Sequence, residues 1–148
     1  MAIWFECKVR YDKMQENGMV KKVNEPYLVD ALTFTEAESR IVEEMKPYIS
    51  GEYSISSEKK TKISEIFYHE GGDRYYLVKA AFISYDNKTD TEKKSISQIL
   101  VQACDLEEAL NNFNEGMKGT VDDYTIVSIA ETAIMDIFKV NLDPNSQE

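Results

Sequence analysis

The first half of the chain alternates between strand-like and helix-like patterns of apolar residues. Apolar side chains at every second position predict strands at residues 5–11 and 27–31. Apolar residues at spacings of three and four follow over residues 34–48 and predict an amphipathic helix. Two short strand-like runs, at 53–57 and 63–68, complete the order β-β-α-β-β.

The second half repeats this order of elements. Strand-like runs lie at residues 74–85 and 99–103, a helix is predicted over 106–117, and two further strand-like runs follow at 124–129 and 133–140. The run at 74–85 is apolar on both of its faces, so we expect it to be the more completely buried strand.

The repeat is also visible in the residues themselves. The segment KKVNEPYLVDALTFTEAE, which begins at Lys21, aligns without gaps with KKSISQILVQACDLEEAL, which begins at Lys93. Both copies place a helix-capping residue at the same point, Thr33 in the first and Asp105 in the second, and a glutamate follows three residues later. A one-residue deletion carries the alignment on to the last strand of each copy. We interpret the pattern as a duplication.

A unit of about 70 residues buries only a marginal core by itself. Each predicted helix has one apolar stripe, which must cover one face of a sheet. We therefore predict an α+β fold in which two β-β-α-β-β units, at residues 1–70 and 73–140, form a single pseudo-twofold domain with an antiparallel sheet packed by two helices. A pair of loosely tethered lobes is the alternative. We expect residues 141–148 to be a polar, disordered tail.

Composition and charge narrow the class of protein. The 148 residues include no apolar run long enough to span a membrane, and the alternating start does not read as a signal peptide, so we expect a cytoplasmic protein without a membrane partner. We expect Cys7 and Cys104 to be reduced there. The net charge of −10 disfavours nucleic acid as a default partner and favours solubility, with a basic partner or imitation of DNA as alternatives.

The sequence has no recognisable catalytic or metal-binding signature. His69 could act as a general base or bind a metal with Glu70 and Asp73, but no second histidine or cysteine lies at ligand spacing. The paired acidic residues show no spacing that would make them converge on a cation. We therefore predict no catalytic residue, no metal and no cofactor. A metal-dependent hydrolase is the least favoured alternative.

Seven lysines are the candidate residues for contact with a partner. Two pairs recur in both copies, and three more lysines decorate the tip of a predicted hairpin after the first helix. They are Lys21, Lys22, Lys93, Lys94, Lys59, Lys60 and Lys62. Lysines beside stacking aromatic residues can hold single-stranded nucleic acid without sequence preference. Lysines at strand edges also simply discourage aggregation between sheets.

The stretches WFECKVRYDK, EPYLVDALTFTEAE and, near the end, DDYTIVSIAETAIMDIFK resemble a domain-of-unknown-function family that is associated with bacteria and their phages. The resemblance covers nearly the whole chain and implies no activity, cofactor or site residue. It adds weight to nucleic-acid handling and to interaction with host proteins. We expect a non-enzymatic binding or interaction protein, phage-related, with an unknown protein partner. A single-stranded nucleic-acid-binding accessory protein is the alternative.

Overall fold

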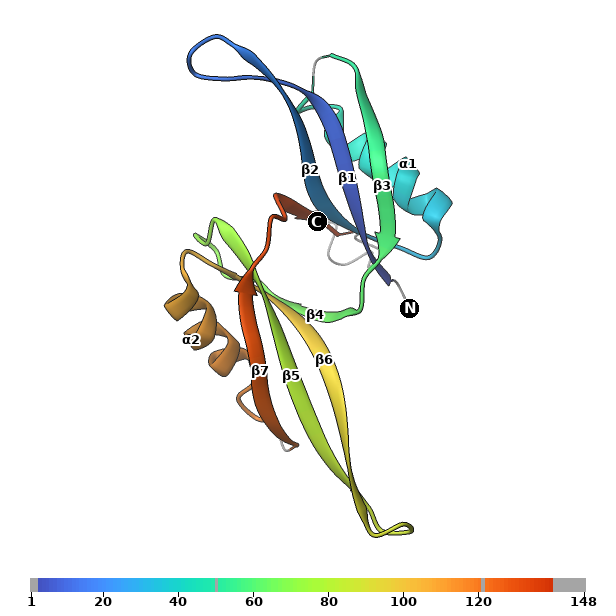
Figure 1. Cartoon of the computed structure of the whole chain (residues 1–148), viewed down its shortest axis with the longest axis vertical. Helices are drawn as coiled ribbons and strands as arrows, with labels where there is room; N and C mark the ends of the chain where they lie inside the picture. Colours follow the sequence, from blue (N-terminus) through green and yellow to red (C-terminus); the bar gives the residue numbers. More distant parts are fainter. Residues whose placement is uncertain (1–2, 50, 121, 140–148) are drawn as a thin grey trace, which may run out of the picture. The chain divides into compact units, whose positions relative to one another are not determined.

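The computed structural model of the protein describes residues 3–49, 51–120 and 122–139 (Figure 1). The predicted order β-β-α-β-β is confirmed in both halves. The elements are β1 (Ile3–Met14), β2 (Val20–Ala31), α1 (Phe34–Met45), β3 (Tyr53–Lys60), β4 (Ile63–Phe67), β5 (Arg74–Asp86), β6 (Thr91–Ala103), α2 (Leu106–Gly116), β7 (Asp123–Glu131) and β8 (Asp136–Phe138). The predicted tail at 141–148 lies outside the described residues.

The strands form two four-stranded sheets, in the orders β3-β1-β2-β8 and β4-β6-β5-β7. The α+β class and the duplicated unit are therefore confirmed. The sheets are mixed, whereas we predicted an antiparallel sheet. Three strands of each sheet pair in antiparallel fashion, but β8 runs parallel to β2, and β4 runs parallel to β6.

The parallel pairs arise because the two repeats exchange their last strands. By its contacts the chain divides into two units, one made of the residues up to Thr61 together with those from Ala133 onward, the other made of Lys62–Thr132. The strand β4 belongs to the first repeat in sequence but completes the second unit, and β8 does the reverse (Figure 1). Ile137 lies opposite Leu28, and Ile66 lies opposite Leu100, so the exchange is reciprocal and in equivalent register.

The repeats at residues 1–70 and 73–140 are thus visible in the sequence, but they do not coincide with the two units into which the contacts divide the chain. That they form one domain with a pseudo-twofold axis stays a prediction. No helix in the described part of the chain is both long and apolar enough to pass through a bilayer.

Each unit buries an apolar core between its sheet and its helix. Alternation along the strands supplies one apolar face, and residues one turn apart supply the stripe of the helix. The first core contains Phe5, Cys7, Val9, Tyr27, Val29, Ala31, Ala37, Ile41 and Met45. The second contains Val78, Ala80, Ile99, Val101, Phe113 and Met117. We call the opposite side of each sheet its helix-free face.

The predicted caps start both helices, and proline shortens one of them. The N–H of Glu36 donates to Thr33 Oγ1 at 3.1 Å, and the N–H of Glu108 donates to Asp105 Oδ1 at 2.8 Å. The helix α1 ends at Met45, before the predicted end at residue 48, because Pro47 has no N–H with which to continue the helical hydrogen bonds. Tyr48, the last residue of the predicted stripe, is exposed.

The first hairpin of each unit is longer than predicted. The strands that we predicted at residues 5–11 and 27–31 extend toward each other, because β1 continues to Met14 and β2 begins at Val20. The strand β3 pairs with β1 only as far as Tyr11, and β7 pairs with β5 only as far as Ile83. Beyond these residues each hairpin is a two-stranded arm with both faces open, and these arms carry most of the candidate lysines (Figure 1).

Candidate functional site

The structure separates the two members of each repeated lysine pair. Neighbouring residues of a strand point to opposite faces of the sheet. Lys22 and Lys94 therefore lie on the helix-free faces, whereas Lys21 and Lys93 lie on the helix side. Lys93 Nζ is also engaged, at 3.6 Å from Asp86 Oδ2. The pairs thus do not form continuous basic grooves.

The predicted basic hairpin tip is wrong, because β4 pairs with β6 and not with β3. Lys59 Nζ lies 3.4 Å from Glu6 Oε1 on the helix-free face of the first sheet. Lys60 Nζ lies on the other side, 5.8 Å from the centre of the Phe34 ring. Lys62 is exposed in the connection that leads into β4. These three lysines do not gather at one place.

Two cations recur at equivalent positions of the helix-free faces. Lys22 lies opposite Asp12 in the first arm, and Lys94 lies opposite Ile83 in the second. Lys8 and Lys79 also correspond, since each directly precedes the point where the register with the edge strand shifts. Neither lysine of this second pair was among the candidates, although aligning β1 with β5 would have matched them.

In the part of the chain that the structure describes, these four lysines are among the cations that stay unneutralised, as Lys21, Lys60 and Lys62 also do. Within the described residues, neither they nor Arg10 make an ion pair. The cations that do make one are Lys13, Arg40, Lys46, Lys59, Arg74, Lys93 and Lys118. Lys8, Arg10 and Lys22 thus form an unneutralised group on the helix-free face of the first sheet, which we call the cationic face.

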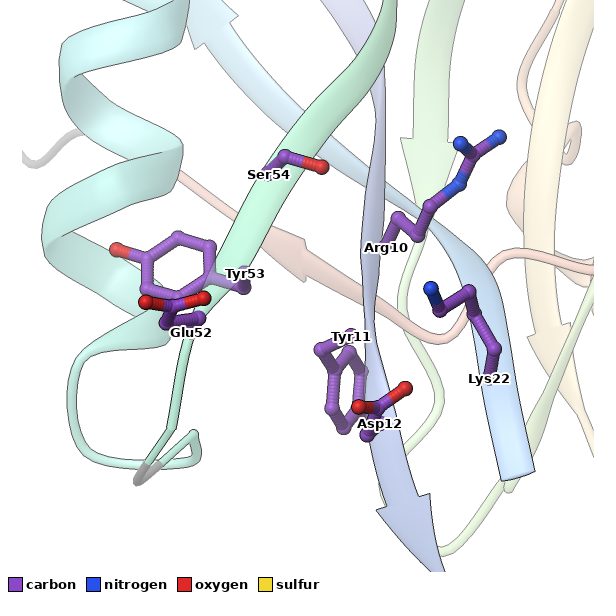
Figure 2. A pocket seen from close by; sticks show the side chains of 7 residues that line it. All are labelled: Arg10, Tyr11, Asp12, Lys22, Glu52, Tyr53 and Ser54. Atoms are coloured by element: carbon purple, nitrogen blue, oxygen red, sulfur yellow. The ribbon is translucent and has the colours of Figure 1, made fainter. Parts of the chain in front are cut away.

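A pocket of about 230 Å³ opens at the outer end of the cationic face (Figure 2). Its lining comes from β1, β2 and the start of β3, and consists of Arg10, Tyr11, Asp12, Lys22, Glu52, Tyr53 and Ser54. Figure 2 shows the side chains of Arg10 and Lys22 extending to one side of β1, while Tyr53 and Glu52 lie on the side of α1. The cations therefore face away from Tyr53, the first residue of β3, and from Glu52, which precedes it. The pocket is an open notch at the edge of the sheet.

The tyrosines near this pocket have structural hydrogen bonds. Tyr11 donates its hydroxyl hydrogen to Glu25 Oε1 at 2.7 Å, and Tyr53 donates to the carbonyl oxygen of Val42 at 3.2 Å. Burial, together with Glu25, raises the pKa of Tyr11 to about 12. The Tyr11 phenol therefore stays protonated at neutral pH, which is unsuited to a nucleophile or a general base.

Both cysteines are free thiols with raised pKa values. Burial, followed by the charges of Glu58 and Glu6, raises the pKa of Cys7 to about 12. Desolvation and then Glu108 raise the pKa of Cys104, whose Sγ donates to the carbonyl oxygen of Gly71 at 3.2 Å. Neither residue has the lowered pKa that activates a catalytic thiol.

His69 lies in the wall of a wider hollow of about 630 Å³ between the end of β4 and α2. Its Nε2 is 3.8 Å from Glu108 Oε1, and its backbone N–H donates to Gln102 Oε1 at 3.1 Å. In the part of the chain that the structure describes, no three or more histidine, cysteine or acidic residues are grouped as metal ligands would be. The structure thus does not bring Glu70 and Asp73 together with His69 as a metal site.

Comparison with known proteins places the chain in a family. Residues 3–140 match the family described as Domain of unknown function (DUF4494). The chain belongs to this family. No curated protein and no solved structure matches it. Family membership assigns this DUF4494 protein no activity, so its function has to be argued from its surface.

Proposed function

We propose that this DUF4494 protein is a non-enzymatic interaction protein that binds an acidic segment of a partner protein on its cationic face. The observation that carries the proposal is the group of Lys8, Arg10 and Lys22, which share one side of the first sheet and make no ion pair among the described residues. The chain has 27 acidic and only 17 basic residues. Cations left unneutralised in such a chain fit an anion supplied by a partner.

The chemistry of the cationic face suits carboxylates. The guanidinium of Arg10 is a planar fork that matches a carboxylate with two parallel hydrogen bonds. Ser54 lies opposite Arg10, and Ser57 lies opposite Lys8, so hydroxyl groups are available beside both cations. Asp12, opposite Lys22, limits how much negative charge the face accepts.

The small amount of negative charge that the cationic face can accept favours an acidic peptide over nucleic acid. Binding a nucleic-acid strand draws its affinity from neutralising several phosphates. The cationic face offers three unpaired cations, and Asp12 lies opposite one of them, Lys22. The chain as a whole has a net charge of −10. Tyr11 and Tyr53 lie on the other side of the sheet, with their hydroxyl groups hydrogen-bonded to the protein. A single-stranded nucleic-acid-binding accessory protein therefore stays the alternative, and a metal-dependent hydrolase stays the least favoured one.

The association with bacteria and phages is part of this proposal, and it would make the partner a host or a phage protein. A cytoplasmic location also belongs to the proposal, because both cysteines are free thiols.

A binding titration tests the proposal. Fluorescence anisotropy would be measured with a fluorescein-labelled polyglutamate peptide and, separately, with labelled oligo(dT), each at low and moderate salt. We expect polyglutamate to bind, with an affinity that falls as salt rises. The double substitution Arg10→Ala and Lys22→Ala should weaken this binding about tenfold.

The matched control is the double substitution Lys46→Ala and Lys118→Ala. It removes the same charge from two exposed lysines, each paired with a glutamate three residues earlier. An equal loss of affinity in both double variants would show that only net charge matters and would refute the cationic face. Binding of oligo(dT) without binding of polyglutamate would replace the proposal with the nucleic-acid alternative.

A further inference from the structure

The helix-free face of the second sheet differs in chemistry from that of the first. The positions of Arg10, Asp12 and Asn24 are polar in the first sheet. At the same registers the second sheet has Ala81, Ile83 and Ile96. Both copies have a lysine at one equivalent register, Lys22 opposite Asp12 and Lys94 opposite Ile83, and they differ around it. The duplicated scaffold therefore presents a polar face in one unit and an apolar face in the other.

The apolar residues of the second sheet form one patch. Ile83 lies directly opposite Lys94, Ile96 follows two residues after Lys94 on β6, and Tyr85 follows two residues after Ile83 on β5. This spacing puts Ile83, Tyr85 and Ile96 on the same face. Ile83 is next to both of the others, with Tyr85 two residues along β5 and Ile96 diagonally across on β6, so the three form a line rather than a compact cluster. The alternate residues of β5, Val78 and Phe82, point into the helix-side core. We call Ile83, Tyr85 and Ile96 the apolar patch.

The apolar patch is open to solvent. Ile96 is 57% exposed and Tyr85 is 56% exposed, and Ile83 is half-buried. Large apolar side chains that cluster on a flat strand surface favour association with another chain. In the first unit the register of Ile96 holds Asn24, so the fold itself does not need an apolar residue there.

The charged residues beside the apolar patch indicate which kind of partner would cover it. Lys79 and Lys94 lie on the same face as the patch, and neither makes an ion pair within the described residues. Glu92, opposite Tyr85, is the acidic residue at the outer end. A second copy of the chain would bring like-charged lysines together across the interface, which disfavours self-association. A different protein that combines apolar and acidic side chains satisfies both features.

We infer that the apolar patch of β5 and β6 is a docking surface for an amphipathic acidic helix of a partner protein. Its apolar side chains cover Ile83, Tyr85 and Ile96, and its carboxylates meet Lys79 and Lys94. Packing one helix on a sheet face is the arrangement that α2 already has on the opposite side of this sheet. The inference adds a second contact surface and rests on the proposal that the protein is an interaction protein.

The test uses the full chain and a synthetic peptide. The probe is a fluorescein-labelled helix of about 18 residues, with leucine along one face and glutamate elsewhere, long enough to form a helix. Anisotropy titration should show saturable binding, and Ile96→Asn should weaken it at least about tenfold. Because Asn24 occupies the same register in the first unit, the substitution is compatible with the strand.

Two controls isolate the patch. Val20→Ser removes another exposed β-branched residue, opposite Met14 in the arm of the first unit, and should leave binding unchanged. A peptide of the same composition, scrambled so that no apolar face forms, should bind at least about tenfold more weakly. The inference is overturned by equal binding of Ile96→Asn and wild type, by equal binding of both peptides, or by no binding at all.

The same two binding assays test the apolar patch and the cationic face independently. The double substitution Arg10→Ala and Lys22→Ala should weaken polyglutamate binding about tenfold and spare the amphipathic peptide. Ile96→Asn should weaken binding of the amphipathic peptide and spare polyglutamate. If the amphipathic peptide depends on Arg10 and Lys22 instead, the patch is not its docking surface, whereas the cationic face gains support.

Discussion

Thr61 donates both its hydroxyl hydrogen and its backbone N–H to the carbonyl oxygen of Trp4, at 2.8 and 2.9 Å. Thr132 makes the same two bonds to the carbonyl oxygen of Tyr75, at 2.9 and 2.8 Å. These threonines are the last residues before the chain passes from one unit to the other. The point where the chain leaves one unit for the other, which we call the crossing, is thus held by the same pair of hydrogen bonds in both repeats.

We predict that Thr61→Val and Thr132→Val each lower the free energy of unfolding by about 1 kcal/mol, because valine keeps the volume but loses one hydrogen bond. Urea unfolding followed by circular dichroism measures the effect. Thr125→Val, on an exposed position of β7, is the control and should be close to neutral. Costs at Thr61 and Thr132 no larger than in this control would show that the hydroxyl bonds do not hold the crossings.

Gly72 supports the close approach of two backbones in the second unit. A Cβ at this position would lie 2.7 Å from the N atom and 2.9 Å from the Cα atom of Ala103, and neither can move without displacing β6. We predict that Gly72→Ala costs about 1–3 kcal/mol through overpacking. Gly51→Ala, where a Cβ meets open space, is the matched control. Equal unfolding midpoints for the two variants in urea would contradict this prediction.

Arg40 connects α1 to the end of β2. Its Nη1 donates to both the carbonyl oxygen and the carboxylate Oδ1 of Asp30, each at 2.6 Å, and Asp30 is buried. Removing the cation from a buried carboxylate costs more than removing one from the surface. We therefore expect Arg40→Met to lower the free energy of unfolding by about 2–4 kcal/mol.

Arg74→Met is the control for Arg40→Met. Arg74 and Glu131 are both about half exposed and lie 3.8 Å apart, so this pair should contribute far less. Thermal unfolding at neutral pH compares the two variants. Similar shifts of the melting temperature would mean that burial does not strengthen the contact between Arg40 and Asp30.

The sequence predicted the elements well because both periodicities are strong. The alternation of Tyr27, Val29 and Ala31 and the helical spacing of Ala37 and Ile41 each bury one continuous face. The class, the duplication and both helix starts followed from such local patterns. The predicted ends of the elements were less accurate. The arms are strands made largely of polar residues, so no alternation of apolar residues marks where these strands end.

The strand exchange was not predictable from local patterns. Ile66 lies opposite Leu100, and Ile137 lies opposite Leu28. If each last strand had instead joined the sheet of its own repeat, each isoleucine would also have faced a leucine. Periodicity indicates a strand but not which sheet edge it joins. The basic hairpin tip was wrong for this reason.

The candidate lysines were partly informative. Lys22 and Lys94 lie on open faces as contact residues would, and their role in binding stays a prediction. Sequence adjacency concealed that Lys21 and Lys93 point to the opposite side. Lys8 and Lys79 were missed because charge was compared only in the stretches that align without gaps.

Glu58 gives the fold a dependence on pH. It lies opposite Cys7 on the helix side of β3, and its Oε2 is buried without a hydrogen-bond partner among the described residues. Burial and then the charge of Glu38, on α1, raise the pKa of Glu58 above its ordinary value of 4.5. The folded state therefore disfavours the ionised carboxylate. This destabilisation is absent below the ordinary pKa and develops as the pH rises through the raised one.

We predict that Glu58→Gln stabilises the protein at pH 7, by a few tenths of a kcal/mol up to about 1 kcal/mol because the side chain is only partly buried. The gain should disappear near pH 4, where the wild-type carboxyl group is itself neutral in the folded state. Urea unfolding at both pH values measures the difference. Glu65→Gln, at an exposed position of β4, is the control and should show no such dependence on pH. A stabilisation by Glu58→Gln that is the same at both pH values would have to come from packing rather than from charge.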